Sequence, residues 1–155
     1  MPLSVSTDVF LETEVPEGIT ESLIADLVAF GLAAEGATGD WEIEVVLGDD
    51  DMLQQLHRDF MGLDSPTDIM TFPDVDESGD APVVTGGQMY ISVDRAATQA
   101  PEFGMSTADE LQFLVLHGVL HLCGWDDATG PMRTAMLDRQ TDLLREFKQS
   151  RSQDR

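Results

Sequence analysis

The segment 111–123, with the sequence LQFLVLHGVLHLC, constrains the fold of this chain more than any other part. Apolar residues occur on nearly every side of the helix that it predicts, which is typical of a helix buried in the protein interior. Ser106 and Thr107, each with an acidic residue three positions later, predict where this helix begins, and Gly124 predicts where it ends. The rest of the chain is therefore expected to pack around one central helix.

Two histidines interrupt this apolar helix. His117 and His121 are four residues apart, so both imidazoles leave the same face. That spacing lets two nitrogens reach one metal ion at about 2.0–2.1 Å, and Asp126 or Asp127, after the turn, can supply a third ligand. Three protein ligands with one open position are typical of a catalytic zinc site. The alternative is two buried histidines bonded to polar neighbours; the pair, the turn and the carboxylates together favour the metal.

The residues beside the histidine pair argue against a peptidase and against a cysteine ligand. Gly118 occupies the position at which H-E-x-x-H metalloproteases carry their glutamate base. If this chain were a peptidase of that type, it would therefore lack the acid–base residue. A glycine inside a helix costs about 1 kcal/mol relative to alanine, which predicts a close packing neighbour. Cys123 lies about 200° round the helix from His121, and we expect it in the core and not at the metal.

The charge of the chain excludes one broad class of function. Thirty acidic residues and eight basic ones give a formal net charge of -22 and a pI near 4.1. A generic electrostatic nucleic-acid binder needs a basic stripe, which this sequence lacks. The acidic residues are spread along the chain, so they form either an ordinary solvated surface or an adaptation to high salt. Screening at about 1 M salt shortens the Debye length to ~3 Å, and we favour salt adaptation.

The length and the ends of the sequence indicate the broad class of protein. A chain of 155 residues fits one domain, and a single cysteine excludes an internal disulfide. We find no signal-peptide pattern and no apolar run of about 18 residues, so the protein is expected to be soluble and cytoplasmic.

The periodicity of apolar residues predicts an α+β or mixed α/β domain over residues 1–150, with 151–155 as a frayed tail. Residues 73–82 are expected to form an acidic loop. The expected strands are Leu3–Phe10, Trp41–Leu47, Asp68–Phe72 and Gln88–Val93, and the expected helices are Glu17–Leu32, Asp50–Phe60, the central helix and one from Pro131.

Three blocks of the sequence resemble one known family. Residues 117–127, HGVLHLCGWDD, resemble the H-G-x-L-H-L-x-G-Y-D-H signature of the YbeY family, single-domain zinc endoribonucleases implicated in rRNA maturation and ribosome quality control. Residues 64–73, DSPTDIMTFP, resemble its D-x-P-T-D-V-L-S-F-P segment, and residues 87–92, GQMYIS, resemble its G-D-I-x-I-S strand. The order and spacing of the blocks match, and the helix pattern fits from about Trp41 to Phe147.

The resemblance implies a fold and an activity. The fold is an α+β domain with a mixed, roughly four-stranded sheet, and the central helix forms the floor of a cleft. His117, His121 and Asp127 would bind one zinc ion per chain, because Asp127 keeps the register of the family's third histidine. Zinc-bound water would act as nucleophile or acid–base group in a single-strand-specific endoribonuclease, with no general base assigned. The implied partners are rRNA and the small ribosomal subunit, without DNA or membrane, and the protein would be a monomer or weak oligomer.

Several positions depart from the family pattern. Met61 stands where the family usually has an arginine, the residue expected to stabilise phosphoryl charge. His57 stands at the position of its asparagine partner and Gln88 at that of the strand aspartate. His57 is either a packed histidine or a weak candidate catalyst. We favour Asp68 as a cap for nearby N–H groups in its turn, and the alternative implied by the resemblance is that this segment lies beside the metal cleft. The alternative functions are a non-catalytic rRNA or ribosome assembly factor with a structural zinc, and a hydrolase of a smaller phosphoester or amide.

Overall fold

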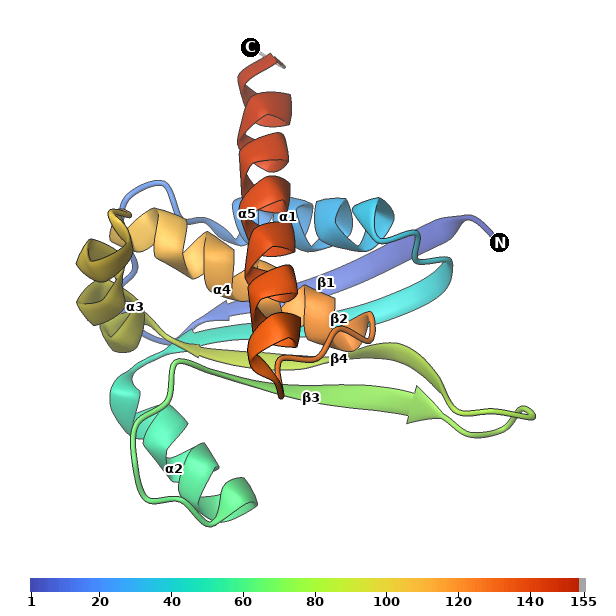
Figure 1. The fold of residues 1–155 in the computed structure, drawn as a ribbon, viewed down its shortest axis with the longest axis horizontal. Coiled ribbons are helices and arrows are strands. Elements are labelled where there is room, and N and C mark those ends of the chain that lie inside the picture. The colour runs from blue at the N-terminus through green and yellow to red at the C-terminus, as the bar shows by residue number, and fades with distance from the viewer. Residues whose placement is uncertain (154–155) are drawn as a thin grey trace.

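The computed structural model describes residues 1–153, which form one α+β domain around a four-stranded mixed sheet (Figure 1). The strand order is β1-β2-β4-β3, in which β3 alone runs antiparallel to its neighbour. This confirms the predicted fold class. The elements are β1 (Leu3–Leu11), α1 (Glu21–Ala34), β2 (Gly39–Gly48), α2 (Asp50–Met61), β3 (Ile69–Asp76), β4 (Val83–Ser92), α3 (Val93–Gln99), the 3-10 helix η1 (Ala100–Phe103), α4 (Thr107–Leu122) and α5 (Gly130–Gln153).

Helix α4 lies at the centre of the domain, as its sequence predicts: it packs on β3 and β4, has α1 beside it, and is covered by α5 (Figure 1). Ser106 caps its N-terminus by accepting a hydrogen bond from the backbone N–H of Asp109 at 3.1 Å. Where α4 crosses β4, a Cβ atom on Gly118 would lie 2.5 Å from Met89 Sδ. The glycine therefore lets the helix approach the sheet closely, which confirms the expected packing neighbour and fixes the height of the two histidines above the strands.

Helix α2 lies on the other face of the sheet. Along β3, Thr71 and Pro73 face α4, so the alternating residue Phe72 faces away from it. The Phe72 ring contacts Phe60 of α2 edge-on, with ring centroids 5.1 Å apart. The first turn of α2 is held by Asp50, whose carboxylate accepts hydrogen bonds from Ser92 Oγ at 2.7 Å and Arg95 Nη2 at 3.0 Å.

The acidic loop is shorter than the sequence predicts. Pairing between β3 and β4 continues outward to Asp76 and Val83, so only 77–82 connect the two strands. Pro73 does not interrupt β3 because this is an edge strand, where a residue without an N–H is tolerated. Gly86 permits the close approach of β2 in this extension, because a Cβ atom there would lie 2.0 Å from the carbonyl oxygen of Glu42.

Two further boundaries differ from those expected, and two short elements were not predicted. Helix α1 begins at Glu21 and not at Glu17, because Thr20 accepts a hydrogen bond from the backbone N–H of Leu23. The short elements α3 and η1 were not predicted, since seven and four residues are too few to display a helical period. Helix α5 continues through Gln153, so the frayed tail predicted for 151–155 is wrong as far as Gln153. Arg151 pairs there with Asp26 at 2.9 Å; the last two tail positions lie outside the described residues.

Within residues 1–153, we find no helix that is both long enough and apolar enough to cross a membrane.

Candidate metal centre

The structure brings His117, His121 and Asp127 together at the C-terminal end of α4 and in the turn that follows. The Nε2 atoms of the two histidines are 3.0 Å apart, and Asp127 Oδ2 lies 3.4 Å from His117 Nε2 and 3.6 Å from His121 Nε2. All three side chains are partly buried. Of the two aspartates left open by spacing, Asp127 reaches the histidines, whereas Asp126 accepts a hydrogen bond from the backbone N–H of Ala128.

Each imidazole makes a hydrogen bond through Nδ1, the ring nitrogen that faces away from the other histidine, and this bond places a proton on Nδ1. His117 Nδ1 donates to Gln140 Oε1 at 2.8 Å, and His121 Nδ1 donates to the carbonyl oxygen of Trp125 at 3.1 Å. Neutral imidazole carries one N–H, so both Nε2 atoms present lone pairs to each other and to the Asp127 carboxylate. When both imidazoles are neutral, these three electron-pair donors repel one another, and a cation between them removes that repulsion.

The donor set fits a zinc ion. Bonds of about 2.0–2.2 Å to a tetrahedral ion place ligand atoms roughly 3.3–3.6 Å apart. The three separations here, 3.0, 3.4 and 3.6 Å, need only small adjustments to match that spacing. Two imidazole nitrogens and one carboxylate oxygen are also a ligand type that zinc accepts.

A buried carboxylate holds the turn that carries Asp127. Glu35, at the end of α1, accepts hydrogen bonds from Trp125 Nε1 at 2.6 Å and from Arg139 Nε of α5 at 2.7 Å. The same Trp125 supplies the carbonyl oxygen that orients His121. Gly124, with a φ of 100°, makes the reversal between helix and turn possible. The turn is therefore tied to both α1 and α5 directly beside the histidine pair.

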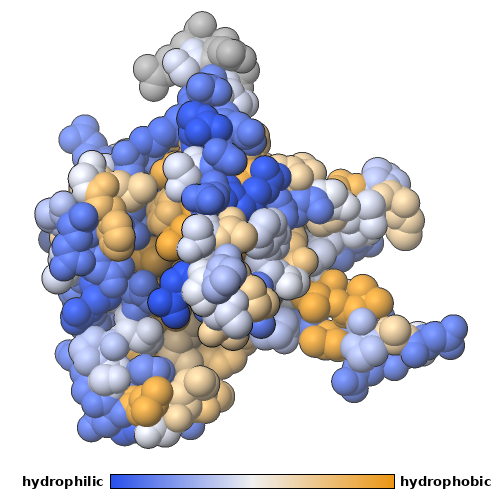
Figure 2. All heavy atoms as spheres, in the orientation of Figure 1, coloured by the Kyte–Doolittle hydropathy of each residue, from blue (hydrophilic) through white to orange (hydrophobic). Residues whose placement is uncertain are grey.

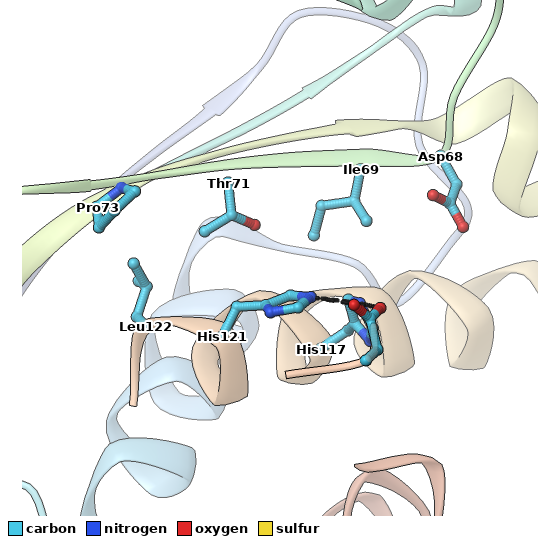
Figure 3. A pocket seen from close by; sticks show the side chains of 8 residues that line it. Asp68, Ile69, Thr71, Pro73, His117, His121 and Leu122 are labelled. Atoms are coloured by element: carbon cyan, nitrogen blue, oxygen red, sulfur yellow. Dashed lines mark hydrogen bonds and ion pairs between the residues drawn. The ribbon is translucent and has the colours of Figure 1, made fainter. Parts of the chain in front are cut away.

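The three side chains open into a cavity of about 460 Å³ between α4 and strand β3. Figure 3 shows His117, His121 and Leu122 on the helix side, opposite Ile69, Thr71 and Pro73 on the strand side, with Asp68 at one end. The central helix thus forms the floor of a cleft, as expected. Among the described residues, no arginine or lysine lines this cavity.

The Asp68 side chain lies beside the metal cleft, as the resemblance implied, and does not have the capping role that we favoured. It lines the cavity, and its Oδ2 accepts a long hydrogen bond of 3.4 Å from Gln99 Nε2 of α3. The expected capping of backbone N–H groups by this carboxylate is therefore wrong. The Asp68 backbone instead extends the pairing of β3 with β4, because its carbonyl oxygen accepts a hydrogen bond from the N–H of Ser92 at 2.9 Å.

The other residues singled out in the sequence lie away from the cluster. His57 Nδ1 donates to the carbonyl oxygen of Ser65 at 3.0 Å, which accords with a packed histidine. Met61 is 63% exposed at the end of α2, and Gln88 Nε2 bonds the Asp74 carboxylate. Cys123 packs against the core, and burial, followed by the charge of Glu35, raises the pKa of its thiol to about 11.

Sequence reasoning missed two supporting residues, Gln140 and Glu35. Gln140 is 1% exposed and lies on the apolar face of α5 that also carries Met136 and Leu143. A polar residue on a predicted buried stripe is a signal that could have identified it. Glu35 gave no such signal, because it lies 90 residues from the tryptophan that it binds.

Comparisons with known proteins agree with this geometry. The family model described as "Endoribonuclease YbeY" matches residues 9–148. Proteins named endoribonuclease YbeY from Chloroflexus aurantiacus and Bacillus velezensis are 38% and 32% identical to this chain, over 86% and 97% of it and 92% and 100% of their own lengths. The solution structure of TM1509 from Thermotoga maritima matches with a TM-score of 0.60 and 26% identity, covering 94% of this chain and 93% of that one. The chain therefore belongs to the YbeY family of endoribonucleases.

Proposed function

We propose that this protein is a zinc-dependent endoribonuclease that cleaves single-stranded RNA during rRNA maturation and ribosome quality control. One observation carries the proposal: in a chain of this family, two lone-pair imidazole nitrogens and a carboxylate oxygen converge at the floor of an open cavity. His117, His121 and Asp127 would hold one zinc ion per chain. A zinc ion in such a site supplies Lewis acidity toward a phosphoryl oxygen and lowers the pKa of a coordinated water.

The residues around the ligands have separate tasks. Gln140 and the Trp125 carbonyl keep both histidines in the tautomer that presents Nε2 to the cavity. Asp68 is the ionisable residue of the cavity lining outside the proposed ligand set, so its carboxylate is the group placed to accept or return a proton. The cavity lies between α4 and β3, and an extended RNA strand fits between two such elements more readily than a rigid duplex.

Metal analysis and RNA cleavage test this proposal together. Purified protein should contain about one zinc per chain and cut a single-stranded rRNA fragment, and EDTA should stop the cleavage. His121→Ala should lose both properties, whereas His57→Ala should keep both. Cleavage that is equal in wild type and His121→Ala would contradict the proposed site.

A second candidate is a non-catalytic rRNA or ribosome assembly factor with a structural zinc. Two observations favour it: Met61 replaces the family arginine, and no basic side chain among the described residues lines the cavity. A single-turnover assay with protein in excess of RNA distinguishes the two functions. An assembly factor would bind the RNA and leave it intact, whereas the enzyme would cut each strand even if product release were slow.

The proposed partners follow from the substrate. We propose binding to rRNA within the small ribosomal subunit, in the cytoplasm, by a monomer or weak oligomer without contact with DNA or membranes. Sedimentation with isolated small subunits in molar KCl tests the association, because at that salt the repulsion between the -22 charge and rRNA is screened. Failure to co-sediment under that condition would contradict this part of the proposal.

A further inference from the structure

A second cavity of about 200 Å³ lies between η1, α4 and α5. It shares Asp68 and His117 with the metal cavity, so the two are adjoining parts of one surface. We propose that this second cavity binds a nucleobase that carries an exocyclic amino group, on the nucleotide next to the bond that is cut. This inference rests on the proposed function and adds to it a subsite with base preference.

Glu110 is the residue that makes this cavity unusual. Its side chain is 2% exposed and lines the cavity, yet Oε2 has no hydrogen-bond partner. The other buried polar side chains of the described residues, Ser92, Gln112 and Gln140, all have partners. Burial, and next the charge of Asp68, raise the pKa of Glu110. An unsatisfied buried carboxyl group is costly to the fold, which indicates that it has a task in binding.

The walls of the cavity favour a flat aromatic ligand over a second metal ion. Phe103 of η1 and Leu137 of α5 line it and are 66% and 42% exposed, and the partly buried Phe113 of α4 lines it as well. Figure 2 shows hydrophobic surface on the α3–η1 side of α5. Within residues 1–153, His117, His121 and Asp127 form the one cluster of three or more His, Cys, Asp or Glu side chains that lie close enough together to hold a metal ion. Exposed aromatic rings are the surfaces on which single-stranded bases stack.

The position of the cavity connects base binding to cleavage. A base held beside Glu110 has its ribose and phosphate directed along the shared border formed by Asp68 and His117, toward the metal centre. Gln140 is already bonded to His117 and to the carbonyl oxygen of Phe113, so it is not available to the base. Glu110 is therefore the buried carboxyl group of the cavity with a free acceptor, whereas Glu102 is exposed to water, and an exocyclic amino group is the natural donor to Glu110.

The probes are five nucleoside 5′-monophosphates, titrated in 1 M KCl and followed by chemical shifts of backbone amides in η1 and α4. GMP, AMP and CMP should bind at least about fivefold more tightly than UMP. GMP should also bind more tightly than IMP, which differs from it by the exocyclic amino group. EDTA-treated protein is used throughout, so base binding is measured apart from any cleavage activity.

Two variants separate base reading from stacking. Glu110→Leu, which removes both acceptor oxygens, should remove most of the preference over UMP and IMP. Phe103→Ala should instead weaken all five probes about fivefold or more and leave their order unchanged. Phe60→Ala is the matched control, because Phe60 is 65% exposed but lies on α2.

The outcomes test the base subsite and the proposed RNA cleavage separately. Equal binding of the five probes, an unchanged preference in Glu110→Leu, or equal effects of Phe103→Ala and Phe60→Ala would each overturn the base subsite. RNA cleavage that persists despite such a result would leave the proposed function standing. The expected preference in a protein that cuts no RNA would instead support the subsite and contradict the reaction.

Discussion

The C-terminal end of α4 and the C-terminal end of α2 are built in opposite ways. At α4, each histidine is held by a second partner on the far side of its ring, and the following turn is tied to α1 and α5 through Glu35. At α2, the side chains of Phe60, Met61 and Leu63 are 65%, 63% and 51% exposed, and the ion pair between Arg58 and Asp64 is long, at 3.7 Å.

This difference accounts for the departure from the family pattern at Met61, whereas Asp127, at the position of the family's third histidine, is a departure within the metal centre that keeps a ligand atom. A residue at α4 has several partners, so replacing it alters the geometry of the metal centre. A residue at the end of α2 has few partners within the described chain, so methionine replaces the family arginine there without disturbing the fold. Its hydrophobic side chain also has no charge with which to stabilise a phosphate.

The largest expected difference between the two regions is in the loss of zinc affinity when a histidine is removed. We expect His117→Ala and His121→Ala each to lower zinc affinity by more than about 100-fold, because each removes a ligand and not an outer partner. His57→Ala, in α2, should keep about one zinc per chain. Zinc competition with a chelating dye measures all three variants, and full occupancy in the double variant of His117 and His121 would refute the site.

The next largest difference in zinc affinity is expected between alanine variants of the two neighbouring aspartates. Asp127→Ala is expected to lower zinc affinity well over tenfold, whereas Asp126→Ala should leave it nearly unchanged because Asp126 caps Ala128. Asp127→His should still bind zinc. It should also move the pH–activity profile to lower pH, because a neutral third ligand leaves the site more positive. Loss of zinc in Asp126→Ala alone would place the third ligand one residue earlier.

Much of the α4 site could be predicted from the sequence, because its signals are local. The helical period places His117 and His121 on one face, and Gly124 marks the turn that follows. The choice of Asp127 over Asp126 needed the family register, since spacing alone allows both. The partners Glu35 and Gln140 come from α1 and α5, and no local pattern links them to the histidines. The second cavity was not predicted for the same reason.

The supports of the two regions should differ in their contribution to stability. Glu35→Gln keeps an acceptor for Trp125 but removes the charge opposite Arg139. The side chains of Glu35 and Arg139 are only 10% and 29% exposed. We expect a loss of about 2 kcal/mol in the free energy of unfolding. Asp64→Asn removes the exposed partner of Arg58 and should cost less than about 0.5 kcal/mol. Urea unfolding of both variants in EDTA measures the difference, and equal losses would contradict the contrast between the regions.

The smallest effect that we predict concerns Glu110 and the pH dependence of stability. Burial, and then the charge of Asp68, raise the pKa of this carboxyl group above its ordinary value of 4.5, so the folded state holds the proton more tightly than the unfolded state. Wild type should therefore lose stability as the pH rises from about 4.5 through the raised pKa. Glu110→Gln carries no ionisable group and escapes this loss, so its stability relative to wild type should increase over that range and stay constant below it. The exposed Glu102 of the same cavity supplies the control Glu102→Gln, whose effect is subtracted as the general consequence of removing one negative charge from an acidic chain. After that subtraction, a difference that is flat from pH 4 to pH 7 would show that the Glu110 carboxyl group is already satisfied, and the reason for assigning it a ligand would disappear.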